Sequence, residues 1–185
     1  MLDELSSEAA WSVGLEINND RAAIVSSKGH NVVMKLEDIK DMSLDVVTMF
    51  HVLEHLSDPI VILDAIRKKL KRGGRIIIEV PHARDVLFTL YDSEPFRRFT
   101  FWSEHLVLHT RSSLHIMLEA AGYKSYETRS QQRYSLANHL YWLTHENPGG
   151  QSEWGFLSST ALLNEYEASL ARIDRTDTLV AFAKC

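Results

Sequence analysis

Short apolar runs alternate with helix-forming segments, and this alternation limits the fold more than any other feature. Residues 12–17, 31–36, 44–50 and 75–80 have the length and apolar character of strands. The run over 44–50 is almost wholly apolar, which is typical of a strand that is covered on both faces. Alternating strands and helices predict a doubly wound α/β domain with a mostly parallel sheet and helices on both faces. Ligands of such sheets bind at the carboxyl ends of the strands.

Capping residues and glycines mark the helix between the last two of these strands. Ser57 or Asp58 is expected to cap it, because both side chains can accept hydrogen bonds from the free N–H groups of a first turn. Pro59 suits the first helical position. Gly73 and Gly74 are expected to end the helix before the strand over 75–80.

Composition limits the domain organisation and the partners. The chain has 185 residues, 45% of them hydrophobic and 24% charged, which fits a single domain over 1–185 with a sizeable core and no second domain. The net charge of -5 argues against a nucleic-acid partner, and no run is long and apolar enough for a membrane span. Cys185 is the one cysteine, so no internal disulfide is possible and a reducing, cytoplasmic location is expected. The acidic start of the chain does not resemble a secretory signal.

The order H-x-x-E-H occurs at His51, Glu54 and His55, and some zinc hydrolases use this order to bind metal. Such a site needs a helix, because the two histidines must share one helix face. Here the motif follows directly on a predicted strand and precedes the helix cap, so it is expected in a loop. No third ligand stands out downstream. We therefore expect no metal, and a zinc hydrolase is the alternative that the spacing leaves open.

The stretch FHVLEHLSDPIVILDAIRKKLKRGGRIIIEVP, residues 50–81, resembles the class I S-adenosylmethionine-dependent methyltransferases. In that family the same order of pieces forms the fourth strand, its loop, the next helix and the fifth strand. The likeness extends over about 2–130 and resumes at 177–184, which resembles the family's last, antiparallel strand. The resemblance implies methyl transfer from S-adenosylmethionine (SAM) to a small-molecule acceptor, with S-adenosylhomocysteine (SAH) as product. A degenerate, non-catalytic binding module derived from such an enzyme is the alternative.

The resemblance also implies roles for individual residues in binding the cofactor. Glu16, at the end of the family's second strand, would bind the ribose hydroxyls, and Asp38 or Glu37 would accept from the adenine amino group. The end of the fourth strand would lie beside the methionine portion. The implied cofactor site consists of Glu16, Ile17, Glu37, Asp38, Ile39, Phe50, His51, Val52 and His55.

Structural roles compete with these assignments. Glu16 could instead stabilise the start of the next helix, and Glu37 and Asp38 could form a solvated turn. Glu54 and His55 could brace their loop. Some related quinone methyltransferases bind a divalent cation through acidic residues and a histidine in the equivalent loop, but His51 takes the first of those positions here.

The family's glycine-rich turn after its first strand has no counterpart. The first glycine is Gly14, inside the run that matches the family's second strand, so the first strand is expected to be missing. Without it, two buried strand edges would carry unpaired backbone groups. Direct pairing of the second and fourth strands, or a homodimer in which another chain donates a strand, is expected to resolve this. A truncated reading frame is the third explanation.

The acceptor site is expected beyond the fifth strand. The segment over 94–110 mixes aromatic and basic residues, and His82, Trp102, Glu104 and His105 could face an acceptor. His51, His82 and His105 are the candidate catalytic bases, since imidazole titrates near neutral pH. An aromatic and polar insert over 131–175 is expected to form a lid over a sugar-like or nucleotide-sugar metabolite, or else a dimer interface. Its marked residues are Arg133, Tyr134, Asn138, His139, Tyr141 and Trp142.

Overall fold

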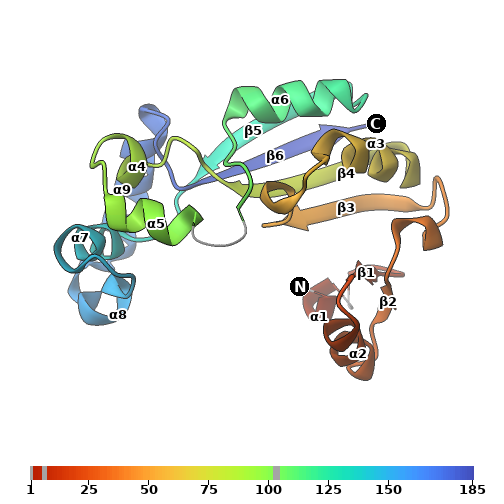
Figure 1. The fold of residues 1–185 in the computed structure, drawn as a ribbon, viewed down its shortest axis with the longest axis horizontal. Helices are drawn as coiled ribbons and strands as arrows, with labels where there is room; N and C mark the ends of the chain where they lie inside the picture. The colour runs from red at the N-terminus through yellow and green to blue at the C-terminus, as the bar shows by residue number, and fades with distance from the viewer. Residues whose placement is uncertain (1, 6–7, 102–104) are drawn as a thin grey trace.

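A four-stranded sheet forms the centre of the computed structural model, which describes residues 2–5, 8–101 and 105–185. The strand order is β3 (Leu44–Phe50), β4 (Leu70–Pro81), β6 (Thr178–Lys184) and β5 (Ser125–Gln131). β3 runs parallel to β4, and β6 runs antiparallel to both β4 and β5. Helices flank this sheet (Figure 1), so the expected α/β class and the antiparallel last strand are confirmed.

The core lies between this sheet and two helices, α3 (Pro59–Lys69) and α6 (Arg111–Ala120), which lie along it in Figure 1. Side chains alternate across a strand, and Ile76, Ile78 and Val80 of β4 are fully buried. Leu63 and Leu114 of the two helices belong to the same buried cluster. Burying each such side chain stabilises the fold by about 1.5–3 kcal/mol.

The helix α3 begins as expected and ends earlier than expected. Asp58 is its N-cap and Pro59 its first residue. The helix ends at Lys69, so the prediction that Gly73 and Gly74 stop it was wrong. Both glycines lie inside β4, where the pairing with β3 shifts register, and Gly73 has a φ of 76°. Glycine adopts this left-handed conformation without steric cost, which explains its place in an irregular strand.

The first part of the chain forms a second, two-stranded parallel sheet from β1 (Val13–Leu15) and β2 (Asn31–Val33). Helix α2 (Asn19–Ser27) connects its strands, and helix α1 (Leu2–Leu5) precedes them. Gly14 lies within β1, as expected. In Figure 1 this small sheet lies next to the free edge of β3 but is not joined to the large sheet.

Direct pairing of β1 with β3 was therefore a wrong prediction. The two strands belong to different sheets, because β1 is only three residues long and pairs with β2 alone. The segment after β2 instead lies against the end of α3. There the N–H groups of Met42 and Ser43 donate to the carbonyls of Lys68 and Lys69. β3 is consequently an edge strand, and its Val46 is 51% exposed, so it is not covered on both faces as its sequence indicated.

The remaining helices gather at the end of the large sheet where β3 and β4 finish (Figure 1). Ser159 caps α9, whose first residue is Thr160. Within the described ranges, no helix is both long and apolar enough to cross a bilayer. The helices of this group are α4 (Val86–Thr89), α5 (Glu94–Phe101), α7 (Leu136–His145), α8 (Gly150–Glu153) and α9 (Thr160–Arg172). The described residues also form three single-turn 3-10 helices, η1 (Leu36–Asp38), η2 (Leu53–His55) and η3 (Gly155–Leu157).

Candidate functional site

Two histidines directly follow the carboxyl ends of the parallel strands β3 and β4. His51 comes after Phe50, and its N–H donates to the carbonyl of Glu79 at 2.9 Å. His82 comes after Pro81, and its N–H donates to the carbonyl of Asp177 at 2.8 Å. Both side chains line a cavity of about 410 Å³, which we call the histidine cavity. It lies where doubly wound sheets bind their ligands.

The wall of the histidine cavity is partly aromatic and partly polar. Phe88 and Phe96 are in ring contact at 4.8 Å between centroids, and Phe96 meets Trp142 edge-on at 5.2 Å. Such walls hold the apolar faces of a small molecule, while a few polar groups fix its orientation. The lining residues are His51, His55, Pro81, His82, Asp85, Leu87, Phe88, Phe96, Phe99, Thr100, His105, Arg133, Tyr134, Asn138, His139, Trp142, Pro148, Asp177 and Thr178.

His82 is completely buried, and its surroundings define which ring nitrogen carries the proton. Nδ1 lies 3.0 Å from the carbonyl oxygen of Thr176, which can only accept, so Nδ1 is the donor. Nε2 then carries the lone pair, and it has no hydrogen-bond partner in the described part of the chain. Burial lowers the pKa of His82, although the nearby Asp174 carboxylate opposes this. The side chain is therefore a neutral base at neutral pH.

His51 has a different environment, because carboxylates flank it on two sides. Its Nδ1 lies 3.3 Å from Oε1 of Glu54, and its Nε2 lies 3.1 Å from Oε1 of Glu79 and contacts Arg133. The interaction with Glu54 raises the pKa of His51, while burial and Arg133 oppose the rise. The backbone has a φ of 54°, which is uncommon outside glycine and occurs at functional sites. These contacts engage both ring nitrogens of His51 and fix its ring at the wall of the histidine cavity.

His105 and His55 complete the histidine cluster. Their ring centroids are 4.9 Å apart, and Nε2 of His105 lies 4.0 Å from Oε1 of Glu54. The three histidines expected as bases, His51, His82 and His105, thus line one cavity together with His55. The two other residues expected to face an acceptor, Trp102 and Glu104, lie outside the described residues.

The loop that carries the H-x-x-E-H motif is not an α-helix. Only residues Leu53–His55 are helical, in the single turn η2, and His51 precedes it. The loop position expected from the sequence is therefore confirmed. Glu54 braces the loop through its carbonyl, which accepts from the N–H groups of Leu106 and Val107.

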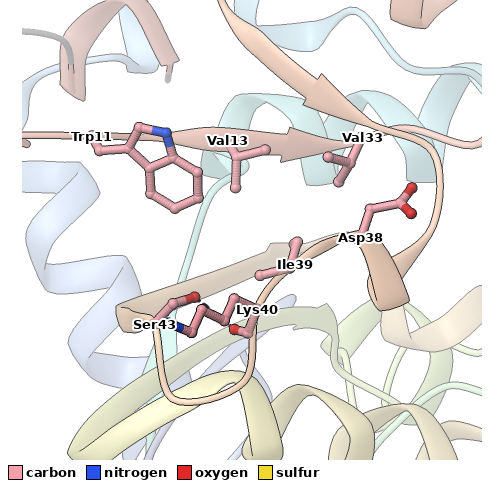
Figure 2. A pocket seen from close by; sticks show the side chains of 7 residues that line it. All are labelled: Trp11, Val13, Val33, Asp38, Ile39, Lys40 and Ser43. Carbon is pink, nitrogen blue, oxygen red and sulfur yellow. Dashed lines mark hydrogen bonds between the residues drawn. The ribbon is translucent and has the colours of Figure 1, made fainter.

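Two of the residues expected to bind the cofactor, Asp38 and Ile39, line a second cavity of about 470 Å³. Figure 2 shows Trp11 and Val13 pointing toward the loop that carries Ile39 and Lys40. This cavity occupies the space between the small sheet and the chain leading into β3, and we call it the inter-sheet cavity. Its lining residues are Trp11, Val13, Val33, Asp38, Ile39, Lys40 and Ser43.

The other residues expected to bind the cofactor line neither the inter-sheet cavity nor, apart from His51 and His55, the histidine cavity. Oε1 of Glu16 accepts from the N–H of Asn18 at 2.9 Å, and Asn18 in turn caps α2. Glu16 therefore supports the start of a helix, which is its alternative role. The members that lie at the surface are Ile17, Glu37, Phe50 and Val52.

Sequence reasoning did not identify three acidic residues beside the histidine cavity, Glu79, Asp85 and Asp177. Asp85 is buried, and burial raises its pKa to about 7 although its carboxylate accepts from the N–H of Leu87. Burial also raises the pKa of Asp177, which accepts from the N–H groups of Arg133 and Tyr134. A signal was present, since Asp85 follows the end of one strand and Asp177 precedes the start of another.

Comparisons with solved structures agree with this architecture. A SAM-dependent methyltransferase from Archaeoglobus fulgidus is 20% identical with a TM-score of 0.65, and the alignment covers 100% of this chain and 80% of that one. One from Thermotoga maritima is 18% identical with a TM-score of 0.60, covering 94% and 72%. Phosphoethanolamine N-methyltransferase 2 of Haemonchus contortus, in complex with SAM, is 16% identical with a TM-score of 0.58, covering 99% and 45%. At these identities the likeness shows the fold.

Sequence comparisons add the family. An uncharacterized protein of Methanocaldococcus jannaschii is 28% identical over 116 residues, which are 61% of this chain. The chain spans 56% of the length of that relative. The family described as "Methyltransferase domain" matches residues 1–128, well over half of the chain. The chain therefore belongs to the methyltransferase domain family, within the class I SAM-dependent methyltransferases that its β3 to β4 segment resembles.

Proposed function

We propose that this protein transfers a methyl group from SAM to a small molecule held in the histidine cavity. The observation that carries the proposal is the neutral, buried His82, which lines the cavity at the strand ends and whose Nε2 has no hydrogen-bond partner in the described residues. The family match supports the reaction class. A base is needed when the acceptor must lose a proton, and His82 supplies one near neutral pH.

The residues present fit the nucleoside part of SAM. In the inter-sheet cavity, the apolar side chains of Val33 and Ile39 lie near the carboxylate of Asp38. This combination suits a flat base that has an exocyclic amino group to donate. Glu16 uses one carboxylate oxygen in its contact with Asn18, which leaves Oε2 for a ribose hydroxyl.

The bound cofactor supplies an activated methyl group on a sulfonium, so the protein must mainly orient the acceptor and exclude water. Nε2 of His82 accepts the proton of an acceptor hydroxyl or amine. The ring pair Phe96 and Trp142 excludes water from the acceptor. His51 and Arg133 hold its polar end at the rim of the cavity.

We further propose that the insert over 131–175 is a lid and not a dimer interface. Six of its residues form part of the cavity wall, and Asp177, just beyond it, holds the backbone of Arg133 and Tyr134 in place. Aromatic rings beside hydroxyl-binding groups suit a sugar or nucleotide-sugar acceptor. The six residues are Arg133, Tyr134, Asn138, His139, Trp142 and Pro148.

A non-catalytic binding module is the second candidate, and the separation of β1 from β3 favours it. A cofactor that spans the two sheets would bind weakly if they moved independently, because it would have to order them. The two functions differ in whether the chain binds SAH and then turns over SAM.

Calorimetric titration with SAH tests the first of these steps. Binding at one site per chain is expected, and Asp38→Asn should weaken it about tenfold, because one hydrogen bond to a charged group is worth about 1.5 kcal/mol. Asp41→Asn is the matched control, since Asp41 pairs with Lys69 and lines neither cavity. Absence of heat at high micromolar SAH would contradict the proposed function.

A further inference from the structure

Glu54 is a buried carboxylate without adequate partners. Its side chain is fully buried, and neither carboxylate oxygen accepts a hydrogen bond from residues 2–5, 8–101 or 105–185. The nearest charged group is His51, whose Nδ1 lies 3.3 Å from Oε1 of Glu54. His51 is shared, because Glu79 and Arg133 contact its other ring nitrogen. Buried ionised groups are normally paired or bound to a metal, so a cation beside this carboxylate would stabilise it.

Two histidines place further ligand atoms beside Glu54. One ligand atom each from Glu54, His55 and His105 lies within 4.8 Å of the others. Nε2 of His105 lies 4.0 Å from Oε1 of Glu54, and the other ring nitrogen, Nδ1, is buried without a hydrogen-bond partner in the described part of the chain. His105 lies beyond α5, far along the chain from the H-x-x-E-H motif, and therefore the sequence did not indicate it as the third ligand.

We propose that Glu54, His55 and His105 form a binding site for a divalent transition-metal ion, with Zn²⁺ as the ion that fits best. Two imidazoles and one carboxylate are typical ligands of Zn²⁺, whereas Ca²⁺ and Mg²⁺ require mainly oxygen ligands. Tetrahedral bonds of about 2.0–2.2 Å separate ligand atoms by about 3.4 Å. The three atoms must therefore approach by roughly 1 Å, which small side-chain rotations achieve.

The site has an open side. His55 and His105 both line the histidine cavity, so a fourth position on the ion faces that space. An ion with three protein ligands and one open position has the arrangement of a catalytic or ligand-binding metal, and not that of a closed structural site. The site differs from a helical H-x-x-E-H centre, because His51 contributes no ligand and remains paired with Glu54 and Glu79.

Metal titration of the full chain tests this site without any assay of methyl transfer. After treatment with EDTA and dialysis, ZnCl₂ should bind at one ion per chain by calorimetry. His105→Ala and Glu54→Gln should each weaken binding at least 100-fold. His145→Ala is the matched control, because His145 is an exposed histidine stacked on Tyr141, and it should bind like the unaltered chain.

A spectroscopic readout keeps the test independent of how the variants fold. Co²⁺ added to the metal-free, unaltered chain should give the intense visible absorption of a four-coordinate site, and equimolar Zn²⁺ should remove it. Weak absorption typical of hydrated Co²⁺, or equal Zn²⁺ affinity in folded His105→Ala and in the unaltered chain, would overturn the proposal. SAH titration of the metal-free chain separates a failure here from a failure of the proposed function.

Discussion

Nδ1 of His82 lies 3.0 Å from the carbonyl oxygen of Thr176, so a backbone group just before the last strand defines the proton position on a side chain at the end of β4. Nε2 thereby carries the lone pair; it has no hydrogen-bond partner in the described residues, and the nearest charged atom is Oδ1 of Asp174 at 3.9 Å. Tertiary contact between two distant segments thus determines which ring nitrogen of this candidate base carries the proton.

Replacing His82 by glutamine should reduce methyl transfer by about 10²–10⁴-fold, the usual contribution of a positioned base. Glutamine can keep the contact with Thr176 but cannot take up a proton. SAH affinity, measured by calorimetry, should stay within about threefold, because His82 does not line the inter-sheet cavity. The rate is measured as SAH release from SAM in the presence of a small-molecule cell extract. His115→Gln, which alters a histidine that contacts Thr128 outside the cavity, is the control, and equal loss in both variants would refute this role.

The pH dependence of His82 follows from its lowered pKa. The groups that face it are Asp174, Arg84, Arg111 and the carbonyl of Thr176. Only the neutral form accepts a proton, so the rate should hold at neutral pH and fall once the pH drops below the folded pKa, which lies under 6.5. The free energy of unfolding should change in the same direction as the rate. It falls as the pH drops from the unfolded pKa of His82 toward the lower folded pKa, because the unfolded chain binds more protons than the folded one in that range. Titration of the ring signals by NMR should give a His82 pKa below 6.5, and a value above it would contradict the burial argument.

Asp85 has the opposite effect on stability. Its folded pKa is about 7 against an ordinary value of 3.8, so the folded protein holds more protons between these values and loses stability as the pH rises through them. Asp85→Asn keeps the cap on Leu87 and removes the charge. The variant should melt a few degrees higher than the unaltered chain at about pH 8 and show little difference near pH 4. Asp92→Asn, at an exposed ion pair, serves as the control and should show no such trend.

Truncation of Ile78 to alanine should lower the free energy of unfolding by about 2–5 kcal/mol, because the side chain is fully buried at the centre of β4. The matched change Val46→Ala, on the exposed side of the edge strand β3, should cost less than about 0.5 kcal/mol. Urea unfolding followed by circular dichroism measures both. Similar losses in the two variants would mean that the face of β3 that carries Val46 is covered in solution.

Periodicity and capping predicted the elements from 44 to 81 well, because local patterns specify a strand, a proline-started helix and a second strand. Leu44–Phe50 has the bounds that its apolar run predicted. The same run did not reveal that β3 is an edge strand, since exposure depends on which segments pair with it. Gly73 likewise signals an irregular backbone in either a helix end or a bulged strand, and only tertiary pairing decides between them.

The candidate site was predictable where a residue's role follows from its position at a strand end. His51 and His82 met that condition, and the structure brings them together. The Glu54, His55 and His105 cluster was not predictable, because its third member comes from a different segment and has no fixed spacing from the others. For Glu16 the position in the sequence left two roles open, and the contact of its carboxylate with the N–H of Asn18 was predictable only as the helix-supporting alternative.

Methyl transfer itself is tested most directly by incubating the chain with SAM that carries an isotopically labelled methyl group and a small-molecule extract, followed by mass spectrometry. The account predicts a small product that bears the labelled methyl, formed together with SAH and strongly reduced with His82→Gln. A chain that binds SAH in the calorimeter yet forms no labelled product from any extract would contradict catalysis and identify the protein as a binding module.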